Sequence, residues 1–327
     1  MTQERPWRSY PQKLEADEEE IGNPLGPPIL WPDGRHLAAN GLGRIFLWEL
    51  ASGECTQALA TEAICRDADP AFTLASEPEL GRVLEGHRIR EFACFDSVSW
   101  KRLAVYSGHT EEVRAATFVS ADRIVSISGD STARLWDAWS GECLATLDTY
   151  PLYALADDPA RSRLVVAGGR GSVWVLDRRT LQKRADYQLP LTKAQHLPLS
   201  EARKKKIGIV WNRPSAHIGA LAWHPDGEHL ICGSWDFVPK LLDLRTGRVE
   251  LEWHGHAHWV DAVAVEPTQR RLVTGSSDGT VRVWSLDNNQ CLGVYELGGD
   301  TVGGLLLHGS SIYATRRGEL LKLPWPD

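Results

Sequence analysis

The chain has 327 residues, of which 43% are hydrophobic and 24% are charged. This composition is typical of a folded globular protein and excludes a disordered or fibrous chain. The net charge of −7 argues against non-specific nucleic-acid binding as the main activity. No run of eighteen apolar residues predicts a membrane-spanning helix. The first twenty residues lack the apolar core of a secretory signal, so the expected location is cytoplasmic.

The N-terminal segment, residues 1–24, differs from the rest of the chain in its charge. It holds a mixed stretch at residues 9–16 and an acidic run at residues 15–20. A run of like charges is most simply a solvated flank. The segment is therefore expected to lie at the edge of the folded part.

Similar segments then recur along the chain. Residues 47–59, 135–147 and 283–297 each combine a β-rich run, a turn, a cysteine and a second apolar run. Weaker copies lie between them, and the anchor positions of the seven copies are residues 48, 95, 136, 176, 242, 284 and 323. Neighbouring anchors are 39 to 47 residues apart, except for one interval of 66. A period of about 40–45 residues is typical of a four-stranded propeller blade, and the long interval indicates an insertion at about 190–214, between the fourth and fifth copies.

The sixth copy shows the pattern within one repeat. Its runs VDAVAVEP, RRLVTGSSDG, TVRVWSL and CLGVYEL alternate with Gly, Ser, Asp or Asn turns. Such runs predict four short strands joined by tight turns. No ten-residue helical pattern interrupts them, which favours an all-β fold.

Two copies carry a more specific pattern, in which a Gly-His pair precedes an Asp that stands six residues before a Trp. The residues are Gly108-His109, Asp130 and Trp136 in the third copy, and Gly255-His256, Asp278 and Trp284 in the sixth. On these residues the chain resembles the WD40-repeat family. The resemblance covers roughly residues 25–327 and implies one domain over residues 1–327, a seven-bladed β-propeller with four antiparallel strands in each blade.

The resemblance also implies a buried relay in which a Trp N–H donates to a strand hydroxyl, which meets a His that is held by the turn Asp. The relay residues are His109, Ser126, Asp130 and Trp136 in the third copy, and His256, Thr274, Asp278 and Trp284 in the sixth. Ser128 and Ser276 stand on the same strands and are alternative hydroxyls. The other copies lack the full set, so we expect them to rely on apolar packing.

The seventh copy ends just after its third strand, at Asp327. An unpaired sheet edge would remain unless another segment supplied the fourth strand. We expect a strand at Ser9–Ala16 to close the ring, with the acidic run as its flank. Removal of residues 1–20 is therefore expected to lower the melting temperature.

Catalytic motifs are absent from the sequence, and no nucleophile stands beside a base. We therefore expect no enzymatic activity and no cofactor. His254, His256 and His258 alternate in a way that could place metal ligands on one face. Because Gly255-His256 fits the relay, no metal site is predicted there, and Asp157-Asp158 are expected in a solvated turn.

In WD40-repeat proteins, partners usually bind the face around the central channel. The positions of this chain that correspond to that face are Trp235, Trp259, Asp261, Tyr153, His217, Glu112, Arg114 and Arg316. Trp, Tyr and Arg are enriched at binding hot spots. Trp235 stands where the third and sixth copies have Gly129 and Ser277, so the repeat pattern does not require it. The resemblance implies a non-catalytic scaffold that binds a protein or peptide over this face.

Two alternatives remain open from the sequence. The channel could hold a small ligand, a metal or an active site. The basic run Arg203–Lys206 in the insertion could dock to nucleic acid, although a solvated loop is the simpler interpretation. The identity of the partner and the oligomeric state are not determined by the sequence.

Overall fold

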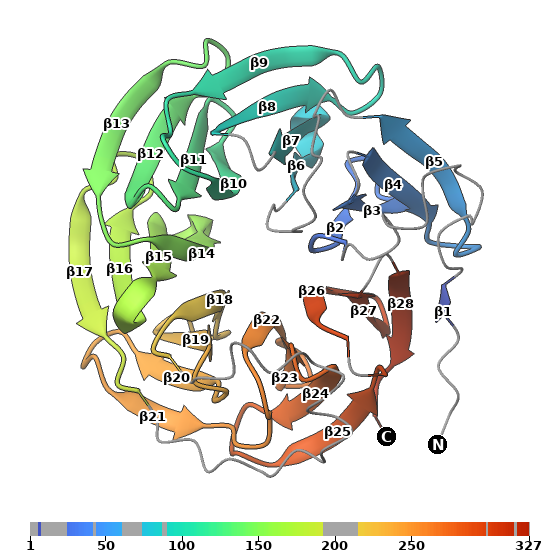
Figure 1. Ribbon diagram of the computed structural model, residues 1–327, viewed down its shortest axis with the longest axis vertical. Helices are drawn as coiled ribbons and strands as arrows, with labels where there is room; N and C mark the ends of the chain where they lie inside the picture. The colour runs from blue at the N-terminus through green and yellow to red at the C-terminus, as the bar shows by residue number, and fades with distance from the viewer. Residues whose placement is uncertain are drawn as a thin grey trace.

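The computed structural model describes residues 6–7, 25–41, 44–60, 74–86, 90–191, 215–298, 300–316 and 319–326. These residues form seven antiparallel sheets that follow one another around a ring (Figure 1). The predicted all-β, seven-bladed propeller is confirmed.

The first four sheets each contain four strands that are consecutive in the chain. Sheet one comprises β2 (Ile29–Leu30), β3 (His36–Gly41), β4 (Arg44–Glu49) and β5 (Cys55–Ala60). Sheet two comprises β6 (Ala75–Glu77), β7 (Arg82–Gly86), β8 (Glu91–Asp96) and β9 (Arg102–Ser107). Sheet three comprises β10 (Val113–Ser120), β11 (Arg123–Ser128), β12 (Thr132–Asp137) and β13 (Cys143–Asp148). Sheet four comprises β14 (Leu152–Asp158), β15 (Arg163–Gly168), β16 (Ser172–Asp177) and β17 (Lys183–Gln188).

The remaining sheets continue the same order around the ring. Sheet five comprises β18 (Ile218–Trp223), β19 (His229–Ser234), β20 (Lys240–Asp243) and β21 (Val249–Glu252). Sheet six comprises β22 (Val260–Glu266), β23 (Arg271–Ser276), β24 (Thr280–Ser285) and β25 (Cys291–Glu296). Sheet seven comprises β26 (Val302–His308), β27 (Ser311–Arg316), β28 (Glu319–Pro324) and β1 (Pro6–Trp7). Short 3₁₀ turns lie at η2 (Pro78–Leu80), η3 (Pro159–Arg161) and η4 (Gly169–Gly171).

Burial of the strands follows their position in each sheet. The second strands β11, β15, β19 and β23 are buried on both faces after their first residue. The fourth strands β13 and β17 have mostly exposed side chains. Inner strands are covered by neighbouring sheets on both sides, so they are continuous apolar or small-residue runs. The outer strands have one solvent-facing side and therefore carry more polar residues.

The hydrophobic core consists of seven clusters in the described residues, and each lies between two neighbouring sheets. One of them joins Tyr313 and Leu320 of sheet seven to Phe46 and Trp48 of sheet one. The ring is therefore continuous in apolar packing between the last sheet and the first. Because no sheet buries its faces alone, each one depends on its neighbours for stability.

The seven anchor positions lie on the third strand of their sheets. In sheet three, Trp136 Nε1 donates to Ser126 Oγ at 2.8 Å, and Ser126 Oγ is 2.7 Å from His109 Nε2. His109 Nδ1 then lies 2.8 Å from Asp130 Oδ2. The chain of contacts therefore runs through Ser126. Ser128 instead donates to the carbonyl of Glu112 at 2.8 Å.

Sheet six repeats this geometry with a threonine. Trp284 Nε1 donates to Thr274 Oγ1 at 2.8 Å, and that oxygen is 2.7 Å from His256 Nε2. His256 Nδ1 is 2.9 Å from Asp278 Oδ2. The Ser276 hydroxyl donates to the carbonyl of His258 at 3.2 Å and takes no part in the relay.

Sheet five departs from the expectation that the other sheets rely on apolar packing alone. Asp236 is fully buried, and the ammonium group of Lys240, also buried, donates to its carboxylate. Lys240 pairs with Cys232 across the sheet, and Leu242 stands where Trp136 and Trp284 stand in the relays. A buried ion pair has therefore replaced the Trp–hydroxyl–His part of the relay, and the expectation was wrong for this sheet.

At the edge of sheet seven, β1 pairs antiparallel with β28, with Pro6 opposite Leu321 and Trp7 opposite Leu320. The strand predicted at 9–16 lies outside the described residues, as does the acidic run. Closure of the ring by that segment stays a prediction.

Candidate functional site

The residues predicted at the channel face lie where first strands begin and second strands end. In an antiparallel pair these two points are adjacent, as Ile218 opposite Ser234 and Val260 opposite Ser276 show. First strands are the innermost strands of the ring (Figure 1). Side chains at these points in successive sheets therefore lie at the same end of the innermost strands.

Four aromatic side chains from sheets four, five and six form a continuous row, which we call the aromatic row: Tyr153, His217, Trp235 and Trp259. The rings of Trp235 and Trp259 are stacked, with centroids 4.7 Å apart and an angle of 19° between their planes. Trp235 also lies 5.2 Å from Tyr153 and 5.2 Å from His217. All four side chains are partly exposed. The row thus offers apolar ring surface to a ligand while remaining anchored in the protein.

The position of Trp235 depends on a small residue beneath it. Its backbone N–H donates to the carbonyl of His217 at 2.9 Å, which fixes the loop that follows β19. A Cβ atom at Gly219 would lie 2.7 Å from Trp235 Nε1. Glycine at 219 therefore leaves the space that the indole occupies.

Asp261 lies beside this row at the start of β22. Its carboxylate accepts a hydrogen bond from Ser277 Oγ at 2.5 Å. Burial raises the pKa of Asp261 to about 6, against the opposing effect of hydrogen bonds from the side chain and backbone of Ser277. Within the described part of the chain, no Lys, Arg or His forms an ion pair with this carboxylate. The negative charge of Asp261 is therefore not neutralised by any of the described residues.

Glu112 and Arg114 of sheet three extend the row on the side of Tyr153. The Arg114 guanidinium lies 5.5 Å from the centre of the Tyr153 ring. Its Nη2 atom is 2.8 Å from a carboxylate oxygen of Glu112. A guanidinium is thus already stacked on one ring of the row. Arg316 lies apart from the row, on sheet seven, where its guanidinium pairs with Glu319 at 3.1 Å.

The three alternating histidines do not converge on a common point. His256 belongs to the relay, and His254 Nε2 is 3.1 Å from Glu252. His258 stacks on Phe237 with ring centroids 5.7 Å apart. Each of the three rings therefore has its own neighbours.

Asp157 and Asp158 do not lie in a solvated turn. They end β14, where Asp157 pairs with Arg178 at 2.6 Å and Asp158 pairs with Arg163 at 2.7 Å. The expectation was wrong because Arg163 stands directly opposite Asp158 in the β14–β15 hairpin, and Arg178 reaches Asp157 from just after the end of β16, 21 residues further along the chain. The basic run at 203–206 and most of the 190–214 insertion lie outside the described residues.

Comparison with known proteins agrees with the fold. The family model described as "WD domain, G-beta repeat" matches residues 100–137, 210–242 and 247–285. These matches and the ring of seven sheets identify the chain as a member of the WD40-repeat family.

The chain is also similar to several curated proteins, all at low identity. It is 24% identical to the serine-threonine kinase receptor-associated protein of Gallus gallus over 252 residues, which are 76% of this chain and 63% of that protein. It is 28% identical to human striatin-4 over 198 residues, 58% of this chain and 23% of that protein. It is 24% identical to WD repeat-containing protein 37 of Mus musculus over 201 residues, 55% of this chain and 40% of that protein. The chain thus spans less than two thirds of the length of these relatives.

Proposed function

We propose that this protein is a non-catalytic scaffold that binds a protein or peptide segment across the channel face, with the aromatic row as its centre. The observation that carries the proposal is the stacked, partly exposed pair Trp235–Trp259. Two indoles that contact each other at a surface are not required by the packing of the sheets, because Gly129 and Ser277 occupy the position of Trp235 elsewhere. Large aromatic surfaces of this kind typically form binding hot spots.

Asp261 adds a charge preference to the same surface. Its carboxylate has no cationic partner among the described residues and lies next to rings that attract cations. The bound segment is therefore expected to place a Lys or Arg side chain at this point. Such a contact would neutralise the carboxylate and stack on the row, as Arg114 already does on Tyr153.

The family supports the interaction role. WD40-repeat propellers typically bind other proteins, and the chicken relative is named for its association with a kinase receptor. Within the described residues no helix has both the length and the hydropathy needed to cross a bilayer. We place the protein in the cytoplasm as part of the same proposal.

Affinity capture with single substitutions tests the proposal. The tagged protein, Trp235→Ala and Trp259→Ala are used as baits for native lysate of the source cells, and the captured proteins are quantified by mass spectrometry. We expect at least one abundant partner to be reduced about tenfold or more with both variants, since a hot-spot Trp contributes roughly 2 kcal/mol or more to binding.

Trp139→Ala is the matched control, because Trp139 is an exposed Trp on sheet three outside the row. It should retain every partner. If all partners survive the Trp235 and Trp259 changes, or if Trp139→Ala loses the same ones, the channel face is not the binding surface. Thermal melting of each variant confirms that the ring is intact.

A further inference from the structure

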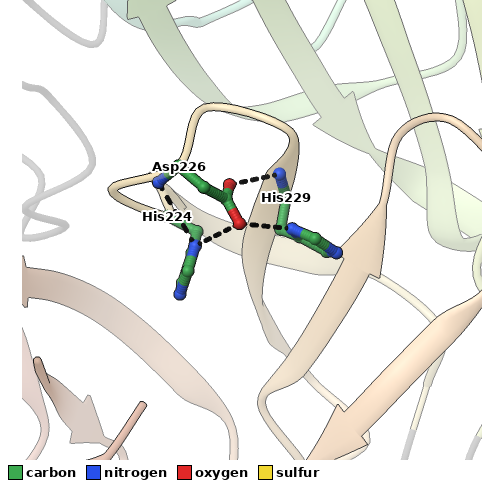
Figure 2. A group of neighbouring side chains, drawn as sticks. All are labelled: His224, Asp226 and His229. Carbon is green, nitrogen blue, oxygen red and sulfur yellow. Dashed lines mark hydrogen bonds and ion pairs between the residues drawn. The ribbon is translucent and has the colours of Figure 1, made fainter. Parts of the chain in front are cut away.

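A second group of side chains lies at the other end of sheet five, away from the aromatic row. His224 and Asp226 belong to the turn between β18 and β19, and His229 is the first residue of β19. His224 Nδ1 and His229 Nδ1 lie 2.9 Å and 2.7 Å from the same oxygen of Asp226, Oδ2. Figure 2 shows the two rings on either side of the carboxylate. We call these three residues the His–Asp–His group.

The turn itself does not require two histidines. Sheet one has the same turn, in which the N–H of Gly34 donates to the carbonyl of Trp31 at 2.9 Å. In sheet five the N–H of Gly227 donates to the carbonyl of His224 at 2.9 Å. His36 Nδ1 lies 2.6 Å from Asp33 Oδ2, as His229 does from Asp226. The position of His224 is taken by Trp31, so a turn of this geometry forms with one His and one Asp.

The two rings turn the same nitrogen, Nδ1, toward one oxygen of Asp226. The backbone N–H of Asp226 donates to His224 Nδ1 at 3.4 Å, so this nitrogen acts as an acceptor. His229 Nδ1 lies 2.7 Å from Asp226 Oδ2, and His229 Nε2 lies 3.1 Å from Glu250 Oε2, so both ring nitrogens face a carboxylate. Both Nδ1 atoms therefore point at the same carboxylate oxygen, and a metal ion would take the place of the Nδ1 proton. A cation between the three atoms would satisfy all of them at once.

We propose that the His–Asp–His group is a binding site for a divalent transition-metal ion of the zinc type. Two imidazole nitrogens and one carboxylate oxygen form a donor set that Zn²⁺ and its first-row neighbours favour. Glu250 provides the further support that metal-bound histidines usually have, a carboxylate on the second ring nitrogen. The sharing of one carboxylate oxygen by two rings is the arrangement that distinguishes this turn from the turn of sheet one.

The surroundings suit an ion that is bound from solvent. The side chain of His224 is 8% exposed and that of His229 is 14% exposed, whereas the Asp226 side chain is 39% exposed. His224 and Gly227 also line a pocket of about 290 Å³ between sheets four, five and six. The carboxylates of that pocket, Asp157 and Asp158, are already paired with arginines. Water or a ligand in the pocket could therefore complete the coordination without competition from these acids.

Binding of Zn²⁺ alone to the purified chain tests the proposal, by calorimetry and by competition with a coloured chelator in a buffer that does not bind metals. The wild-type protein should bind one equivalent more tightly than any residual site. His224→Gln should weaken this binding at least about tenfold, since loss even of a supporting residue in a metal site costs 10- to 100-fold. His224 is the better choice for substitution because the turn of sheet one forms without it.

Two control variants separate this site from ordinary surface histidines. His36→Gln removes the single His of the corresponding turn in sheet one, and His254→Gln removes an exposed His of sheet six. Neither substitution should change the affinity for the one tightly bound equivalent of Zn²⁺. If wild-type protein binds no stoichiometric Zn²⁺, or if His224→Gln binds it as tightly as wild type, the proposal is wrong.

Two further measurements, a Co²⁺ absorption spectrum and a thermal melting curve, test the site without a comparison of affinities. Co²⁺ in place of Zn²⁺ gives visible absorption whose intensity reports the ligand set, and Zn²⁺ should raise the melting temperature of wild type because it binds only the folded chain. Both effects should be absent in a folded His224→Gln protein. Unchanged spectra and melting shifts in that variant would contradict the site.

Discussion

Sheets five and six are neighbours with the same turn but different means of holding it. In sheet six the turn carboxylate, Asp278, is held by His256, Thr274 and Trp284 in a line of hydrogen bonds. In sheet five the corresponding carboxylate, Asp236, is paired with the buried ammonium group of Lys240. Both carboxylates also accept the backbone N–H two residues further on, at 2.9 Å and 3.2 Å. The carboxylate is thus the common requirement of the turn, and the group that neutralises it can vary.

The relay of sheet six and the ion pair of sheet five should differ in how much the free energy of unfolding falls when one of their residues is replaced. The relay distributes its contacts over several neutral and charged groups, whereas the ion pair of sheet five depends on one buried cation. Removing one partner from a buried ion pair leaves a charge in the interior and is strongly destabilising. Breaking a hydrogen-bond relay costs the desolvation of the polar groups that remain.

The largest effect is expected from Lys240→Met. This change leaves the Asp236 carboxylate buried without its ion-pair partner, and we expect the free energy of unfolding to fall by about 3–5 kcal/mol. Urea unfolding followed by fluorescence measures it. The double variant Asp236→Asn, Lys240→Met removes both charges and should recover most of the loss. A single variant as stable as wild type would show that the pair is not required.

A smaller loss is expected from Asp278→Ala in sheet six, and from Asp130→Ala in sheet three. Each change orphans the relay His and should cost about 1–3 kcal/mol. Burial acts to raise the pKa of Asp278, but His256, Thr280 and the N–H of Ala257 outweigh it, so that the pKa lies below its usual range.

The sign of the pH dependence of these variants follows from that shift. A carboxyl with a lowered pKa in the folded state stabilises the protein above the unfolded value of about 3.9, and this stabilisation is lost as the pH falls. The difference in stability between wild type and Asp278→Ala should therefore be largest near pH 7 and should become smaller below about pH 4. Thermal melting at both pH values measures it, and an equal difference at both would contradict the assignment.

The two sheets meet at Asp261, which lies beside Trp235. Its pKa is raised to about 6 by burial, above the unfolded value of about 3.9. The stability that this group contributes is present below pH 4 and is lost as the pH rises through 6. Asp261→Asn cannot ionise, so it should gain about 1–2 kcal/mol relative to wild type between pH 5 and pH 8. Urea unfolding at the two pH values tests this. If the stability difference between Asp261→Asn and wild type is the same at pH 5 and pH 8, burial does not disfavour the ionised form of Asp261.

The smallest expected effect is an increase in stability, produced by adding the hydroxyl group that a relay in sheet one would need. Trp48 lies on the third strand like Trp284, and it pairs with Leu37 as Trp284 pairs with Leu272. Its Nε1 atom is buried without a hydrogen-bond partner, and Ala39 stands where sheet six has Thr274. Ala39→Ser would supply an acceptor and should stabilise the fold by about 0.5–1.5 kcal/mol.

The neighbouring residue provides the control for this last change. Ala38 is also buried, but it packs in a different cluster and faces away from Trp48. Ala38→Ser should therefore destabilise the protein, because its hydroxyl is buried without the indole donor. Equal effects of the two substitutions on the melting temperature would show that the hydroxyl does not reach Trp48.

Much of the fold could be predicted because each repeat is a run of consecutive hairpins. Within a hairpin the register is fixed by the turn, so residues at set distances along the chain become cross-strand neighbours. The relay of His109, Ser126, Asp130 and Trp136 follows from this rule. The pairing of Lys240 with Asp236 follows from the same rule, because Lys240 stands four residues after Asp236, on the next strand. The repeat pattern does not predict it, since the pattern specifies only the Trp that Leu242 replaces.

The His–Asp–His group illustrates a local signal that was open to two interpretations. Its residues stand close together in the sequence as His224-Pro225-Asp226-Gly227-Glu228-His229. The Pro-Asp-Gly part predicts a turn, and this is correct. The orientation of the two rings toward one carboxylate oxygen depends on side-chain rotamers and on packing against neighbouring sheets, which the turn pattern does not specify.

The sequence by itself therefore determined the number of sheets, the order of their strands and the relays within sheets three and six, because these depend on spacing along the chain. Only the tertiary structure decided that Trp235 would stack on Trp259, that Arg114 would lie over Tyr153 and that Asp261 would lack a cation among the described residues. These contacts join side chains of different sheets. Their geometry is set by how the sheets rotate and pack against one another around the ring, and no periodicity in the chain encodes that angle.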